Sequence, residues 1–124
     1  NINVSGPRSC AKGRHAMKVS EVAKNASLKA FNDCPDKEIE TVYISDMVSD
    51  IINTGEGSLL VTLQTHKNLV AAANLVDVSA VIFTRGKEPS ADVIELADKA
   101  GIGLYGFKAD TWSLAKKLYE IGLR

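Results

Sequence analysis

Apolar residues along the chain repeat with two periods, and the two periods alternate. Short runs in which nearly every residue is apolar or β-branched predict buried strands. These runs are 41–44, 58–62, 78–84 and 102–105, with a shorter alternating run at 28–30. Between them, apolar residues three and four apart predict helices. We therefore expect an α/β fold in one compact domain, whose mostly parallel sheet is covered by helices on both faces.

Polar capping residues and one glycine set the expected ends of the helices. The residues placed to begin helices are Ser20, Ser45, Thr65, Ser90 after Pro89, and Asp110 or Thr111. Gly101 is placed to end the helix that follows Ser90. The buried stripe of the helix beginning at Ser45 is expected to be Met47, Val48, Ile51 and Ile52. The later helices are expected to bury Leu69, Ala72, Ala73 and Val76; then Val93, Leu96, Ala97 and Ala100; then Leu114, Ala115, Leu118 and Ile121.

Composition narrows the class of protein. A length of 124 residues and a hydrophobic share of 45% are enough for one core without disulfides or a structural metal. Lys and Arg number 15, as do Asp and Glu, so no broad basic field is available for nucleic acid. The apolar runs are far shorter than the roughly 20 residues of a membrane span. Cys10 and Cys34 lack metal-ligand or disulfide-framework spacing, so we expect a soluble protein of the reducing cytoplasm.

The first sixteen residues differ from the rest. They contain Arg8, Lys12 and Arg14 and no acid, a charge of +3 against −3 for the remainder. They lack the apolar run of a signal peptide, and the regular alternation of predicted helices and strands begins at Met17. We expect 1–16 to be a vector-derived leader or a disordered basic arm, and 17–124 to be the domain.

Two short segments partly match nucleotide-binding motifs, but each lacks a feature that its motif requires. Gly101, Gly103 and Gly106 match the dinucleotide spacing, but they close a helix and frame a strand, the reverse of the required order. We expect them to serve a C-cap and close packing. Gly86-Lys87 lacks the upstream glycine of a Walker loop, which excludes a kinase of that type.

Three titratable residues are candidates for chemistry. Asp46 and Asp50 are expected to share a solvated face of the helix beginning at Ser45, with acid–base work or cation binding as the alternative. His66 is the only histidine outside residues 1–16. A single histidine cannot by itself form a metal site or a catalytic triad. We expect it to be exposed at the start of a helix, with a ligand or interface contact as the alternative. No cofactor and no metal are expected.

The position of the loops gives the strongest indication of a site. Ligands of open parallel sheets bind at the carboxyl ends of the strands, where helix N-termini offer N–H groups. Segments 64–68, 84–87 and 108–111 meet there, with Arg85 as a fixed charge and Gly86 as a further amide. The candidate binding residues are Gln64, Thr65, His66, Asn68, Thr84, Arg85, Gly86, Asp110 and Thr111. The alternative is that these loops need polar caps in any α/β protein.

The segments 43–50, 62–71 and 81–89 resemble the DRTGG domain family, over roughly 17–124. The chain is similar to the short stand-alone clostridial type, which is often labelled a serine kinase by its likeness to the N-terminal domain of HPr kinase and occurs near iron-hydrogenase genes. Many members read Gly-Asp-Arg where this chain has Gln64-Thr65-His66, and Thr-Gly-Gly where it has Thr84-Arg85-Gly86. The resemblance implies a regulatory or assembly module, as beside CBS domains in some pyrophosphatases, and no catalysis.

The sequence therefore predicts a non-enzymatic regulatory or interaction domain that senses a small anionic metabolite or nucleotide. Trp112 and Tyr119 lie off the main stripe of the last helix, and with the resemblance they predict a homodimer. Three alternatives remain. They are a structural adaptor for a hydrogenase-related or signalling protein, an enzyme using His66 with Asp46 or Asp110, and a nucleotide-binding protein using the helix N-termini.

Overall fold

The central feature of the fold is a five-stranded sheet in the order β3-β8-β7-β6-β5. The computed structural model describes residues 17–32, 36–53 and 56–122, so the expectations for 1–16 and Cys34 lie outside the described residues. The strands are β3 (Lys29–Ala30), β5 (Thr41–Ile44), β6 (Ser58–Thr62), β7 (Ala80–Phe83) and β8 (Gly103–Gly106). β5, β6, β7 and β8 run parallel, and β3 pairs antiparallel with β8. The expected mostly parallel α/β sheet is confirmed.

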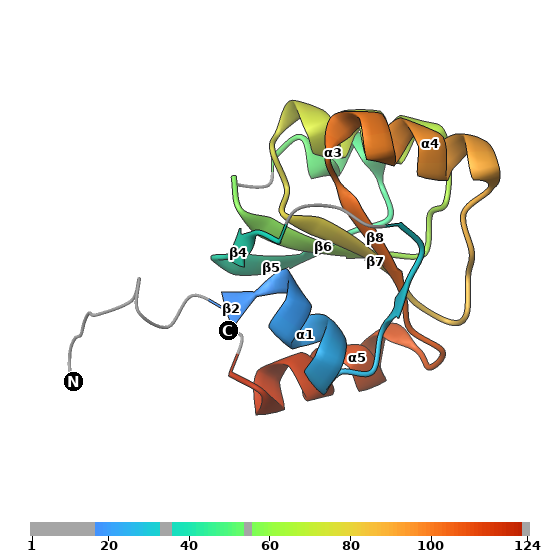
Figure 1. Ribbon diagram of the computed structural model, residues 1–124. Coiled ribbons are helices and arrows are strands. Elements are labelled where there is room, and N and C mark those ends of the chain that lie inside the picture. The colour runs from blue at the N-terminus through green and yellow to red at the C-terminus, as the bar shows by residue number, and fades with distance from the viewer. Residues whose placement is uncertain (1–16, 33–35, 54–55, 123–124) are drawn as a thin grey trace.

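Helices cover both faces of the sheet, as Figure 1 shows. On one face lie α2 (Val48–Ile51), α3 (Lys67–Leu75) and α4 (Ala91–Ala100); on the other lie α1 (Val19–Asn25) and α5 (Thr111–Glu120). Each layer has its own core, and every residue of β6 and β7 is buried between them, which explains their nearly continuous apolar sequence. The first core is built around Leu60, Leu69, Val81, Phe83 and Leu104, and the second around Val22, Val61, Ile82, Leu114 and Leu118.

The N-terminal part contains a two-stranded unit that the pattern did not predict. β2 (Met17–Lys18) pairs antiparallel with β4 (Glu38–Ile39). Ser20 was expected to cap α1, but the helix already begins at Val19 with Lys18 as its N-cap. The hydroxyl and N–H of Ser20 instead donate to the Asp36 carboxylate at 2.7 and 2.9 Å, and these bonds lower the pKa of Asp36. A distant acceptor has replaced the local cap.

The expected helix start at Ser45 is wrong. Ser45 directly follows β5 and is not helical: its N–H donates to the Val61 carbonyl, and its hydroxyl accepts from the N–H of Met47. The helix begins only after Met47, which shifts its buried side. Ile51 is buried as expected, whereas Met47 and Ile52 are 63% and 51% exposed; the side chain of Val48 lies outside the described part.

The three spaced glycines serve packing and capping, as expected. Gly101 adopts the left-handed conformation at φ 73° and ends α4. A Cβ on Gly106 would lie 2.9 Å from the ring of Phe31, and one on Gly103 would lie 3.0 Å from the ring of Tyr105. The backbone of β8 can therefore approach these aromatic rings only because it lacks side chains there.

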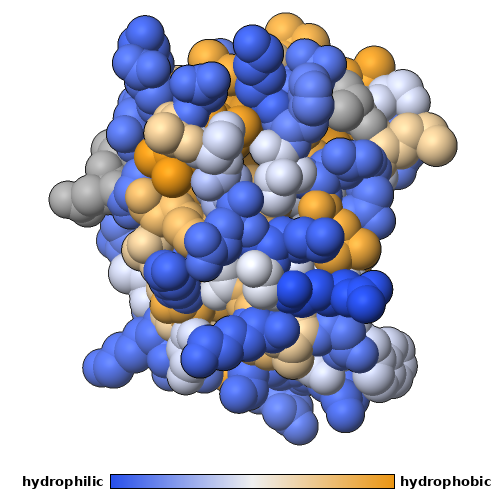
Figure 2. All heavy atoms as spheres, turned by 90° about the vertical axis from the view of Figure 1, so that its right-hand side faces the viewer, coloured by the Kyte–Doolittle hydropathy of each residue, from blue (hydrophilic) through white to orange (hydrophobic). Residues whose placement is uncertain are grey.

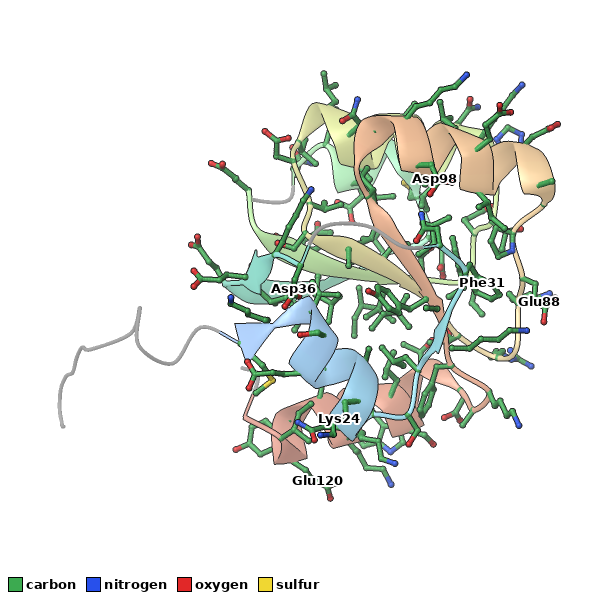
Figure 3. All side chains as sticks on the ribbon, in the orientation of Figure 1. Lys24, Phe31, Asp36, Glu88, Asp98 and Glu120 are labelled. Atoms are coloured by element: carbon green, nitrogen blue, oxygen red, sulfur yellow. The ribbon has the colours of Figure 1, made fainter. Side chains whose placement is uncertain are left out.

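Residues 31 and 32, which follow β3, continue the pairing along β8. After β3, the N–H of Phe31 donates to the Leu104 carbonyl. The Asn32 amide then acts as one more strand residue: its Nδ2 donates to the Ile102 carbonyl and its Oδ1 accepts from the N–H of Leu104, each at 2.9 Å. At the same edge Lys29 reaches Glu88 at 3.4 Å, and its ammonium lies 5.5 Å from the centre of the Phe31 ring; Figure 3 labels Phe31 and Glu88 on this side of the molecule.

Replacing Asn32 with alanine is expected to lower the free energy of unfolding by about 1–3 kcal/mol, because two backbone groups of β8 lose their hydrogen-bond partner. Urea denaturation measures the change. Asn74→Ala, at an exposed position of α3, is the matched control and should change stability by no more than about 0.5 kcal/mol. Equal stabilities of the two variants would contradict this role.

Candidate functional site

The loops that follow the parallel strands form one surface. They lie on the right of Figure 1 and face the viewer in Figure 2, where hydrophilic side chains occupy most of the surface and apolar patches remain between them. The carboxyl ends of parallel strands share one edge of a sheet, so residues distant in sequence meet here. This is the edge at which the sequence placed the candidate site.

Hydrogen bonds from Thr62 and Leu63 fix Asp46 on this surface. Its Oδ1 accepts from the Thr62 hydroxyl at 3.0 Å and from the N–H of Leu63 at 2.6 Å. Asp46 lies before α2, so the expectation that it shares a helix face with Asp50 is wrong. Asp50 lies within α2, where its hydrogen bond and negative charge raise the pKa of Tyr43. The two carboxylates therefore serve different contacts.

The turn after β7 is joined to the loop after β8. The Thr84 side chain is buried, and its hydroxyl lies 2.8 Å from that of Thr111. The N–H groups of Arg85 and Gly86 donate to the carbonyls of Ala109 and Phe107, at 2.7 and 2.9 Å. The expected anion-binding amide of Gly86 is therefore already occupied by protein.

Arg85 holds an unusual backbone conformation in this turn. Arg85 and Gly86 have φ of 60° and 70°, and the N–H of Lys87 donates to the Thr84 carbonyl. Two successive left-handed residues favour glycine, and the conformation costs a residue with a Cβ about 1–2 kcal/mol. Backbone hydrogen bonds around the turn stabilise it, and they fix the position from which the exposed Arg85 side chain extends.

Two open hollows lie side by side on the surface. The Arg85 hollow, of about 580 Å³, is lined by Asp46, Leu63, Gln64, Arg85 and Lys87. The His66 hollow, of about 700 Å³, is lined by Asp46, Met47, Gln64, His66 and Asn68. Asp46 and Gln64 belong to both, so together they form a common wall. Each volume is typical of small-molecule sites, about 300–1,000 Å³.

His66 caps α3 in place of the expected Thr65. Its Nδ1 accepts from the N–H of Asn68 at 3.2 Å, so that amide, expected to be free for an anion, is also occupied. An accepting Nδ1 leaves the hydrogen of the neutral imidazole on Nε2. Asp46 and His66 line one hollow, but Oδ1 of Asp46 and Nδ1 of His66 each accept a hydrogen bond from a backbone N–H group, and no hydrogen bond joins the two side chains among the described residues. This arrangement gives no support to a catalytic base oriented by an acid.

Of the sequence-derived candidates, Gln64, His66, Asn68 and Arg85 line the two hollows. Thr84, Gly86, Asp110 and Thr111 instead make contacts within the protein, and Thr65 lines neither hollow. Thr84 and Thr111 bind each other, and Asp110 caps α5 by accepting from the N–H of Ser113 at 2.8 Å. Hydrogen bonds from Ser113, aided by the charge of Arg85, lower the pKa of Asp110. The lining residues outside the candidate set are Asp46, Met47, Leu63 and Lys87.

The charges on the surface favour an anion over a metal ion. Arg85 and Lys87 line the same hollow, and the opposing carboxylate of Asp46 already accepts two hydrogen bonds. Within 17–32, 36–53 and 56–122, no group of three or more His, Cys, Asp or Glu side chains is placed to hold a metal. None of the helices in this described part has the length and apolarity to cross a membrane.

Replacing His66 with alanine is expected to reduce the free energy of unfolding by about 1 kcal/mol, because the N–H of Asn68 loses its cap. His66→Asn, which supplies a capping oxygen, should restore most of the loss. Thermal melts of the three proteins test this. An alanine variant as stable as the parent would show that the imidazole has no capping role.

Comparison with known proteins places the fold in a family. The family model of the DRTGG domain matches residues 24–121. A solved structure of the CBS and DRTGG domains from the regulatory region of Clostridium perfringens pyrophosphatase, complexed with its activator diadenosine tetraphosphate, aligns with a TM-score of 0.64 at 22% identity. The alignment covers 81% of this chain and 45% of that one, so this chain corresponds to less than half of that regulatory region.

No match was found among curated proteins. The solved structure is part of the regulatory region of that pyrophosphatase, and its likeness to this chain shows a shared fold. The family model spans the sheet from β3 to β8 and the helices on both its faces. The chain belongs to the DRTGG domain family.

Proposed function

We propose that this chain is a non-catalytic regulatory domain of the cytoplasm that senses a small anionic ligand at the carboxyl edge of its sheet. The observation that carries the proposal is the placement of Arg85: a backbone pinned at positive φ presents its side chain to a hollow that also receives Lys87. Local backbone strain kept by surrounding contacts is typical of binding positions.

The geometry favours recognition by side chains. The N–H groups of Arg85, Gly86 and Asn68 are engaged within the protein, so they are not the anion-binding groups expected from the sequence. The guanidinium of Arg85 can form two parallel hydrogen bonds with a carboxylate or phosphate, and the ammonium of Lys87 adds a point charge. The Gln64 amide on the same wall supplies a further donor.

The solved neighbour supports sensing over catalysis. It is a regulatory region and was captured with a nucleotide activator. In this chain, the contacts behind the hollow connect it to α5: Thr84 binds Thr111, and Arg85 binds the loop before that helix. A ligand held by Arg85 would therefore act on the same turn that holds the N-terminus of α5, which gives binding a route to a distant face.

Arg85→Ala is expected to weaken binding of the anion by about tenfold to a hundredfold, the loss of one charge-assisted contact, with little change in melting temperature. A thermal-shift screen of nucleotides, acyl phosphates and sugar phosphates supplies the ligand, since 100 times the dissociation constant stabilises by about 2.7 kcal/mol. Calorimetry then measures affinity. Asp50→Ala, outside both hollows, should bind as the parent does. Unchanged affinity in Arg85→Ala would exclude this site.

We also propose that the chain forms a homodimer through α5. Trp112 and Tyr119 are 70% and 62% exposed and lie seven residues apart, so they share one helix face. With Ala115 between them they line an apolar hollow of about 330 Å³. In a two-fold pair of antiparallel helices, the Trp112 of each copy would face the Tyr119 of the other, which is a self-complementary arrangement.

Light scattering is expected to give twice the 13.3 kDa of the chain at micromolar concentration. Trp112→Glu should give the monomer mass, because it places a charge in the apolar contact. Leu75→Glu, at a position 76% exposed on α3, is the matched control and should leave the dimer intact. A parent protein that stays at 13.3 kDa would overturn the proposal. The exposed face of α5 would then be a candidate surface for a different protein, as in the alternative of an adaptor for a hydrogenase-related or signalling protein.

A further inference from the structure

We infer that the ligand is a nucleoside monophosphate, with its phosphate in the Arg85 hollow, its ribose against Asp46 and Gln64, and its base in the His66 hollow. The inference rests on the proposed function and specifies the ligand of the same site. It follows from the contrast between two adjoining hollows that share one wall. A ligand that filled both would need a charged end, a polar middle and a flatter, less polar body.

The His66 hollow has the features of a base-binding surface. Met47, although apolar, is 63% exposed and lines the same hollow as His66. Sulfur and aromatic groups both contact flat rings favourably, and stacking on a side-chain ring is tolerant of base identity. The bond from the N–H of Asn68 fixes the orientation of the imidazole before any ligand arrives. This surface is therefore preorganised.

Side-chain amides lie beside this surface. Asn68 and Gln64 line the His66 hollow, and each amide offers both a donor and an acceptor. That pair of groups matches the N6 and N7 edge of adenine, the usual partner of Asn and Gln in nucleic-acid recognition. We therefore expect an adenine base to bind more tightly than a guanine base.

The common wall supplies a group for the sugar. The Oδ1 atom of Asp46 is held by Thr62 and Leu63, whereas its Oδ2 accepts no hydrogen bond from the described residues. A fixed carboxylate with an available oxygen is a good acceptor for ribose hydroxyls, as in dinucleotide-binding folds. Asp46 would repel a phosphate placed against it, so the phosphate belongs at the Arg85 and Lys87 end.

The test compares three ligands that share parts. Calorimetry with the full chain measures AMP, ribose 5-phosphate and GMP. AMP should bind at least tenfold more tightly than ribose 5-phosphate, since stacking and base contacts are lost with the base, and more tightly than GMP. Arg85→Ala should weaken AMP and ribose 5-phosphate alike, by about tenfold or more.

Variants of the residues expected to contact the base test the His66 hollow separately from the Arg85 hollow. Met47→Ala and His66→Asn should each weaken AMP by about fivefold or more and leave ribose 5-phosphate unchanged. His66→Asn keeps the helix cap, so its loss of affinity reports the missing ring. Ile52→Ala, at an apolar position 51% exposed near Met47 in sequence but outside the hollows, is the control and should bind both ligands as the parent does.

The outcomes distinguish this inference from the function on which it rests. Equal binding of AMP and ribose 5-phosphate, both dependent on Arg85, would overturn the nucleotide assignment and retain the anion site. AMP binding that is unaffected in both base-end variants would overturn the position of the base. Binding of all ligands unaffected by Arg85→Ala, or binding of none of these phosphates or of the anions in the thermal-shift screen, would overturn the site itself.

Discussion

Two buried threonine hydroxyls at the ends of the central strands organise the whole ligand-facing edge. The Thr62 hydroxyl donates to Asp46 and accepts from the N–H of Gln64. The backbone carbonyl of Thr62 accepts from the N–H of Thr84. The Thr84 hydroxyl then pairs with that of Thr111. Buried polar groups need such partners, and here each partner comes from a different loop. The sheet therefore determines where four loops lie without any of them being long.

The sequence predicted the elements whose signals are local. The apolar runs located the strands of the parallel sheet, and Gly101 and Asp110 ended and began helices at the expected residues. The predictions from sequence failed where a hydrogen-bond partner distant in the chain replaced a local one. Ser20 bonds Asp36 instead of capping α1, and Asp46 bonds Thr62 instead of opening a helix. No periodicity within a single segment contains information about such partners.

The candidate site was predictable in position and only partly in composition. Topology placed Gln64, His66, Asn68 and Arg85 on the edge correctly. Asp46, considered only for acid–base work or cation binding, and Met47 were not among the expected ligand-binding residues, because the sequence predicted a helix there in which Met47 would be buried. The amide of Gly86 was expected to be free because its carbonyl partner, Phe107, comes from another loop. In this turn Arg85 adopts a φ that favours glycine, and its side chain adds a charge to the surface.

The Asn32 contact also controls how this sheet can meet other strands. An uncovered edge strand is a template for aggregation, and proteins usually block it. Here two residues of β3 and one side-chain amide occupy the hydrogen-bonding groups of β8, so an incoming strand finds them taken. The opposite edge, β5, has a neighbour only on its β6 side within the described residues. An incoming strand therefore cannot pair with β8 unless it first displaces β3 and the Asn32 amide.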